Sequence, residues 1–129
     1  MDGIALDVNF DPKSFRAFNR NEGHMTISIS GSAESPAYWC ECDITAKSPL
    51  SLAHDTELGA GHIRIGIFRG KAIEKKIRIY TRPNNYPENY PVAITLFVYG
   101  EDGTIAGRVE KRVEIECKDT RGMKDGKDV

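Results

Sequence analysis

Long hydrophobic runs, a basic leader and N-glycosylation sequons are all missing from this 129-residue sequence. Residues 1–7 contain neither the basic segment nor the apolar segment of a secretory signal peptide. No stretch approaches the roughly 20 apolar residues that a membrane-spanning helix needs. The absence of Asn-X-Ser/Thr favours an intracellular protein. We therefore expect a cytoplasmic chain, although a segment excised from a larger surface protein would look the same.

Cysteine is scarce and odd in number, with three residues at Cys40, Cys42 and Cys117. An odd count does not give a closed disulfide framework, so reduced thiols are the simpler reading. Zinc, with one of the three histidines as a fourth ligand, is the alternative. Its structural sites usually space two ligands by two to four residues, whereas Cys40-X-Cys42 on a strand faces both sulfurs along one row. We expect buried, reduced thiols, no metal and no cofactor.

An excess of one charge is also lacking, since 18 basic residues balance 19 acidic ones and the formal net charge is -1. Attraction of the whole molecule to nucleic acid or anionic lipid is thus not expected. Hydrophobic residues make up 40% and charged residues 29%, as in an ordinary folded domain. The sequence predicts one domain over residues 1–117 and a disordered, charged tail over 118–129.

What the sequence does contain is alternation of apolar and polar residues with period two, which is typical of strands that bury one face. A helical period is not evident, and about seven such runs separated by turn signals indicate an all-β sandwich or barrel rather than a mixed α/β fold. The inward rows include Ile63, Ile65 and Ile67 in the fourth run. The runs cover 4–10, 25–30, 38–45, 63–67, 73–80, 92–99 and 105–117.

Lys75 and Lys111 stand in the inward phase of two of these runs. A buried, unpaired ammonium group would cost several kcal/mol, so neither side chain can simply enter the core. Inward lysines also keep exposed strand edges from pairing with other chains. We expect both residues on edge strands or bulged segments.

The segment Pro87-Glu88-Asn89-Tyr90-Pro91-Val92 resembles the start of the penultimate strand of immunoglobulin-like domains, where a tyrosine precedes the inward row. Phe10-Asp11-Pro12, followed by a long polar link, is similar to the opening of immunoglobulin-like and fibronectin-type-III-like modules of prokaryotic, especially archaeal, proteins. The resemblance implies an all-β, immunoglobulin-like antiparallel sandwich of about seven strands, in which Tyr90 anchors its loop through a hydroxyl hydrogen bond. It also implies recognition of proteins, or a spacer role, rather than chemistry.

Catalytic motifs are not recognisable. The serines, histidines and carboxylates are scattered and no nucleophile segment surrounds them. Gly59-Ala60-Gly61 precedes a strand rather than a helix, so it lacks the helix N-terminus that binds phosphate. We expect a protein that is not an enzyme.

Large aromatic residues in the outward phase are the most informative functional feature. Trp39, Phe97 and Tyr99 share one outer face if their strands pair as in immunoglobulin folds. Exposed aromatic patches are enriched at protein interfaces. The alternative is that the loop 48–61, with Leu50, Leu52 and Leu58, folds over them.

A basic strip offers a second hypothesis, nucleic-acid or anionic-ligand binding. Glu74 is the only countercharge within the strip, but the net charge of the chain is near neutral and the basic residues spread over two strands, so a solvated strand face is the stronger explanation. We therefore expect a non-enzymatic interaction or structural module that binds a protein partner or itself through the aromatic residues, with the strip as the alternative. The strip comprises Arg64, Arg69, Lys71, Lys75, Lys76, Arg78 and Arg82.

Overall fold

The computed structural model describes residues 4–31, 37–54, 56–69 and 72–121. Within these ranges all the regular structure is β. The strands are β1 (Ala5–Asp11), β2 (Ser14–Arg16), β3 (Asn21–Ser30), β4 (Tyr38–Ala46), β5 (Leu50–Ser51), β6 (Ala60–Phe68), β7 (Ile73–Thr81), β8 (Asn89–Tyr99) and β9 (Ile105–Lys118).

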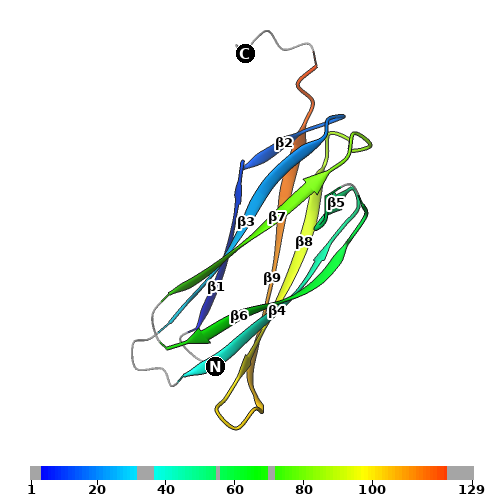
Figure 1. Ribbon diagram of the computed structural model, residues 1–129. Coiled ribbons are helices and arrows are strands. Elements are labelled where there is room, and N and C mark those ends of the chain that lie inside the picture. Colours follow the sequence, from blue (N-terminus) through cyan, green and yellow to red (C-terminus); the bar gives the residue numbers. More distant parts are fainter. Residues whose placement is uncertain (1–3, 32–36, 55, 70–71, 122–129) are drawn as a thin grey trace.

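The strands form two sheets (Figure 1). One has the order β1-β3-β7-β5, and the other has the order β2-β9-β8-β4-β6. All pairs are antiparallel except β2 with β9. The hairpin between β8 and β9 projects beyond the neighbouring strands (Figure 1).

The core consists of the inward rows of both sheets, which form one cluster of buried side chains. Burial alternates along β3 and β8, as the period of two predicts. β-Branched residues suit such positions because they pack well on a pleated surface. The fully buried rows of these two strands are Met25, Ile27 and Ile29, and Val92, Ile94, Leu96 and Val98.

The described residues contain nine strands rather than about seven, because the sequence pattern missed β2 and β5. Phe15 of β2 is buried and pairs with Cys117, and Leu50 of β5 is buried and pairs with Thr81. Strands of two or three residues are too short to show an alternation. Their pairing depends on chain segments that lie far away in the sequence.

The prediction that Ile67 points inward is wrong. β4 and β6 change register between Cys40 and Glu41, so that Cys40 pairs with Gly66 and Glu41 pairs with Arg64. Ile65 is the extra residue of this β-bulge, and Gly66 has φ +132°, a conformation that favours glycine. The bulge reverses the phase, so Phe68 is buried and Ile67 is exposed.

The expectation that Lys75 and Lys111 lie on strand edges is confirmed. β5 pairs with β7 only at Tyr80 and Thr81, so Lys75 lies where that side of β7 is open among the described residues. Lys111 likewise lies on the open side of β9, because β2 pairs only with its last residues. Lys111 Nζ reaches Asp7 Oδ1 of β1 at 3.6 Å, across the seam between the two sheets.

Residues 118–121, which the sequence assigned to a disordered tail, are ordered against the sandwich. Lys118 is the last residue of β9, and its carbonyl oxygen accepts a hydrogen bond from Ala17 N at 2.7 Å. The Arg121 guanidinium stacks 4.0 Å from the centre of the Phe18 ring. Residues 122–129 of the predicted tail lie outside the described residues. No helix in the described ranges is long and apolar enough to span a membrane.

Candidate interaction surface

The outer face of the five-stranded sheet brings apolar side chains from four strands into one line. Trp39 of β4 pairs with Ile67 of β6 on one side and with Tyr99 of β8 on the other. Tyr99 in turn pairs with Ile105 of β9. We call Ile67, Trp39, Tyr99 and Ile105 the apolar row.

The apolar row is open to solvent. Ile67 is 51% exposed, Trp39 37% and Ile105 61%, whereas Tyr99 is partly buried between its neighbours. Three of the five large hydrophobic side chains that are exposed in the described residues therefore belong to this one row, with Tyr99 between Trp39 and Ile105. Scattered single exposures are normal on protein surfaces, but a contiguous set is not.

Phe97 occupies the next outward position along β8, opposite Glu41 of β4 and Arg108 of β9. The Arg108 guanidinium lies 5.9 Å from the centre of the Phe97 ring and also pairs with Glu110 at 2.8 Å. The structure thus places all three predicted aromatic residues on one face, with Phe97 beside the apolar row rather than in it.

A groove of about 400 Å³ runs beside the apolar row at the hairpin end of the sheet. Trp39 and Ile67 form its apolar wall, and Arg69 and Glu101 supply charges of both signs. This size lies within the range of about 300–1,000 Å³ that is usual for ligand pockets. The groove residues are Ala37, Tyr38, Trp39, Ile67, Arg69, Gly100 and Glu101.

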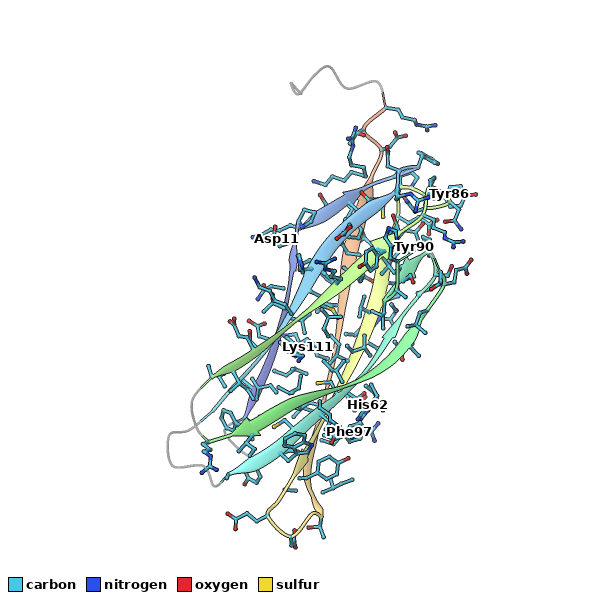
Figure 2. All side chains as sticks on the ribbon, in the orientation of Figure 1. Asp11, His62, Tyr86, Tyr90, Phe97 and Lys111 are labelled. Carbon is cyan, nitrogen blue, oxygen red and sulfur yellow. The ribbon has the colours of Figure 1, made fainter. Side chains whose placement is uncertain are left out.

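A polar network on β4 and β6 binds the indole group of Trp39. The indole Nε1 of Trp39 donates to Glu41 Oε2. The other oxygen of this carboxylate lies 2.5 Å from His62 Nε2, and His62 Nδ1 lies 2.5 Å from Asp43 Oδ1. In Figure 2, His62 and Phe97 lie toward the same end of the molecule.

The network shifts the protonation equilibria of its members. Hydrogen bonds to Asp43 and then to Glu41 raise the pKa of His62 above its ordinary value of 6.5. Hydrogen bonds from Trp39 and then from His62 lower the pKa of Glu41 below 4.5. Both shifts favour the charged forms, an imidazolium between two carboxylates.

The alternative that the loop 48–61 covers the aromatic residues is wrong. Leu50 enters the core through its pairing with β7, in the opposite sheet. Leu58 is itself exposed, and Leu52 packs against the core. Because the loop is attached to the other sheet, it leaves Trp39 exposed.

The cysteines are free and buried, as expected. Burial raises the pKa of Cys40 to about 11, of Cys42 to about 12 and of Cys117 to about 11. A thiol with a raised pKa carries little thiolate, the reactive form. Within the described ranges, no group of three or more His, Cys, Asp or Glu side chains is placed to hold a metal ion.

The predicted basic strip is divided between the two sheets. Arg64 lies on β6 beside Glu41, whereas Lys76 and Arg78 lie on β7 of the other sheet. Arg78 also pairs with Glu22 at 3.5 Å. Arg69 lies in the groove, Arg82 lies at the far end of β7, and Lys71 lies outside the described residues. The strip therefore does not form one continuous surface.

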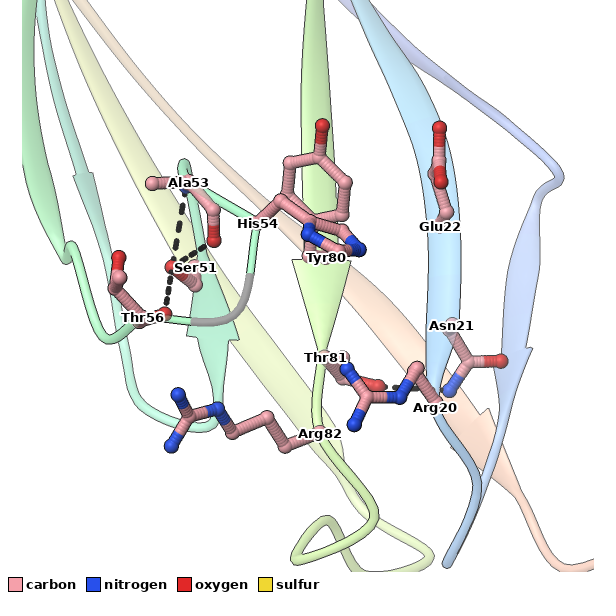
Figure 3. A pocket seen from close by; sticks show the side chains of 10 residues that line it. All are labelled: Arg20, Asn21, Glu22, Ser51, Ala53, His54, Thr56, Tyr80, Thr81 and Arg82. Atoms are coloured by element: carbon pink, nitrogen blue, oxygen red, sulfur yellow. Dashed lines mark hydrogen bonds between the residues drawn. The ribbon is translucent and has the colours of Figure 1, made fainter.

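A second, smaller pocket of about 190 Å³ lies between β3, β7 and the segment after β5 (Figure 3). One of its polar residues, Ser51, holds that segment. Ser51 Oγ accepts hydrogen bonds from Ala53 N at 3.2 Å and Leu58 N at 3.0 Å, and it donates to Thr56 O at 2.7 Å. The pocket is small, and Ser51 in its wall serves to hold the loop, so we assign the pocket to loop packing.

Sequence reasoning found the aromatic residues but missed Ile67, Ile105 and His62. The outward direction of Ile67 depends on the bulge. Gly66, a glycine inside a strand pattern, was the sequence signal for that bulge. Ile105 headed the predicted row that continues with Gly107 and Val109, but a register shift between Val98 and Tyr99 of β8 brings it opposite Tyr99 instead. The meeting of His62 with two carboxylates depends on the pairing of β4 with β6, which a single sequence does not display.

The comparisons concern the fold. No protein-family model matches the sequence, and no curated protein matches it significantly. The FixG-related protein from Vibrio parahaemolyticus is similar in structure, with a TM-score of 0.50 and 12% identity over 92% of this chain and 99% of that one. The sporulation control protein Spo0M from Bacillus subtilis has a TM-score of 0.50 and 11% identity over 92% of this chain. The chain spans 50% of the Spo0M chain. At such identities the likeness shows an all-β fold shared with bacterial proteins and nothing of activity.

Proposed function

We propose that this protein is a non-enzymatic interaction module that binds another polypeptide through the apolar row. The observation that carries the proposal is the contiguous exposure of Ile67, Trp39 and Ile105 around Tyr99, on four neighbouring strands. Aromatic residues are enriched at protein interfaces, and contiguous apolar patches are seldom left to water.

The surroundings of the apolar row suit a polypeptide partner. Arg64 and Arg108 on one side, and Arg69 and Glu101 on the other, form a charged rim around an apolar centre. Interfaces commonly have such an apolar centre and polar rim. The neighbouring groove can accept a side chain of the partner.

We also infer that the sandwich is of the immunoglobulin-like, fibronectin-type-III-like kind. Without the short strands β2 and β5, the sheet orders become β1-β3-β7 and β9-β8-β4-β6. These orders correspond to strands A-B-E and G-F-C-C′ of that class. Tyr90, at the start of the strand equivalent to F, supports the assignment because its hydroxyl bonds to the backbone of Tyr86 upstream. Modules of this class commonly act in recognition.

The proposal is tested by photo-crosslinking in the source cells. A photoreactive phenylalanine analogue replaces Ile105 in the apolar row or, as a control, Tyr86, which is 57% exposed at the other end of the molecule. We expect a defined crosslinked polypeptide from position 105 and none from position 86. Trp39→Ser in the same chain should abolish the crosslink because it removes the centre of the row.

Sedimentation velocity of the purified chain distinguishes a second copy from another protein as the partner. A crosslink to the chain itself together with a dimer that Trp39→Ser dissociates identifies self-association. Equal crosslinking at positions 105 and 86, or crosslinking that survives Trp39→Ser, contradicts the proposal.

A further inference from the structure

The geometry of His62 requires a particular protonation state. Both ring nitrogens face carboxylate oxygens, Nε2 that of Glu41 and Nδ1 that of Asp43, each at 2.5 Å. Neutral imidazole has one N–H donor and one acceptor nitrogen, whereas imidazolium has two donors. Two ionised carboxylates accept hydrogen bonds but donate none. The contacts on both sides of the ring therefore require the cation.

The cation acts on Trp39 through a shared carboxylate. Glu41 accepts the Trp39 indole N–H on one oxygen and contacts His62 through the other. Trp39 is the central side chain of the apolar row and a wall of the groove. A change in the position of Glu41 therefore moves or frees the largest side chain of the proposed surface.

Loss of the proton leaves two negative charges close together. Glu41 and Asp43 are two residues apart on β4 and point to the same face. On β8 their neighbours are the uncharged Phe97 and Thr95, and one strand further Arg108 is already paired with Glu110. Arg64 of β6 lies opposite Glu41 and lowers its pKa to a smaller extent than Trp39 and His62 do. His62 is the member of this set whose charge changes near neutral pH.

We propose that His62 is a proton switch for the interaction surface: its imidazolium holds Glu41, and through it Trp39, in the arrangement that lines the groove, and loss of the proton releases them. This regulation rests on the proposed function of the apolar row. The pKa of His62 is raised in the folded protein, so the ordered arrangement is fully present below about 6.5, the unfolded value. It is lost as the pH rises through the folded-state value.

The chain carries its own probe of this switch, because Trp39 is its only tryptophan. Fluorescence of the full chain and its quenching by acrylamide are measured from pH 5.5 to 9. We expect one transition with a midpoint above 6.5 and greater quenching on the alkaline side. His62→Gln should abolish the transition, since glutamine does not titrate. The matched control His24→Gln alters a histidine on β3 of the other sheet and should retain it.

A second variant tests the link through Glu41. Glu41→Gln removes one of the two carboxylates that stabilise the cation, so the midpoint should fall toward 6.5. Circular dichroism at both ends of the pH range verifies that each variant is folded. A flat fluorescence profile in the wild-type chain, or the same transition in His62→Gln, overturns the proposal.

These measurements need no partner, so they are independent of the crosslinking experiment. A fluorescence transition without any crosslink would remove the proposed function and leave His62 coupled to Trp39. A crosslink of equal yield at pH 6 and pH 9 would leave the function and overturn its regulation.

Discussion

Tyr90 fastens the loop before β8 with a single hydroxyl group. The hydroxyl accepts a hydrogen bond from Tyr86 N at 2.9 Å and donates to Tyr86 O at 3.2 Å, and the ring is buried (Figure 2). The sequence-based expectation for Tyr90 is therefore confirmed. Burial is the main cause that raises the pKa of this phenol above 10, so the hydroxyl stays protonated and able to donate.

Asn85 performs a related role from inside the same loop. Its side chain is fully buried, and its Nδ2 donates to Asn19 O at 2.7 Å and Arg82 O at 2.7 Å, while its Oδ1 accepts from Phe18 N at 2.9 Å. It thereby ties the turn between β2 and β3 to the loop after β7. A buried amide with this many partners stabilises the two connecting segments that it joins.

Tyr90→Phe should lower the free energy of unfolding by about 1 kcal/mol, because the Tyr86 backbone loses one hydrogen-bond partner in a partly buried site. The measurement is the midpoint of urea denaturation. Tyr86→Phe is the control, since the exposed hydroxyl of Tyr86 can be removed while its ring still contacts Phe18. An unchanged midpoint in Tyr90→Phe would remove the anchoring role.

At the scale of the element, one bulge residue in β6 decides which side chains of the strand are exposed. Regular alternation would have buried Ile67 beside Ile63 and Ile65. The bulge opposite Cys40 and Glu41 instead sends Ile67 to the outer face and buries Phe68. The apolar row therefore contains Ile67 because the phase of β6 changes at the bulge.

Gly66→Ala should destabilise the protein by about 1–3 kcal/mol, the usual cost of a side chain in a strained backbone conformation. An added Cβ at Gly66 meets no atom within 4 Å, so the cost comes from the backbone at φ +132° and not from a collision. Denaturation midpoints measure it, with Ile67→Ala as the neighbouring control at an exposed site. Loss of less than 0.5 kcal/mol, the usual effect of a surface substitution, would argue against a required glycine.

For the whole molecule, the open strand edges decide whether the sandwich stays separate from other copies. Among the described residues, β1 and β6 lie at sheet edges, and much of β7 and β9 is open as well. Lys75 and Lys111 occupy the open parts of β7 and β9, and the bulge interrupts the regular ladder of β6. Both devices hinder pairing with another chain.

Replacing Lys75 and Lys111 together by valine should cause self-association, since it removes the charge from the inward-phase rows of two open strand edges. The Lys111–Asp7 ion pair joins exposed groups 3.6 Å apart, so its loss should change stability little. Light scattering and sedimentation velocity measure the association. The double substitution by arginine keeps both charges and should stay in the wild-type state. A valine variant that stays in the same association state as the arginine variant would show that the lysines do not prevent self-association.

The sequence by itself determined the elements whose signal is local. Alternation along 25–30 and 92–99 predicts two long strands with their buried rows, and it places Trp39 outward because Glu41 and Asp43 share its phase. The hydroxyl anchor of Tyr90 was likewise expected from a short motif. These inferences hold because side-chain direction in a strand repeats every two residues.

The tertiary structure alone decided which strands are neighbours and in which register. The two-residue strand β5, the three-residue strand β2 and the bulge at Ile65 exist only through pairing with distant segments. The same pairing places Ile67 and Ile105 beside Trp39 and Tyr99, and sets His62 between Glu41 and Asp43. Hydrogen bonds between strands join residues that are remote along the chain, so one sequence displays the faces of its strands but not their partners.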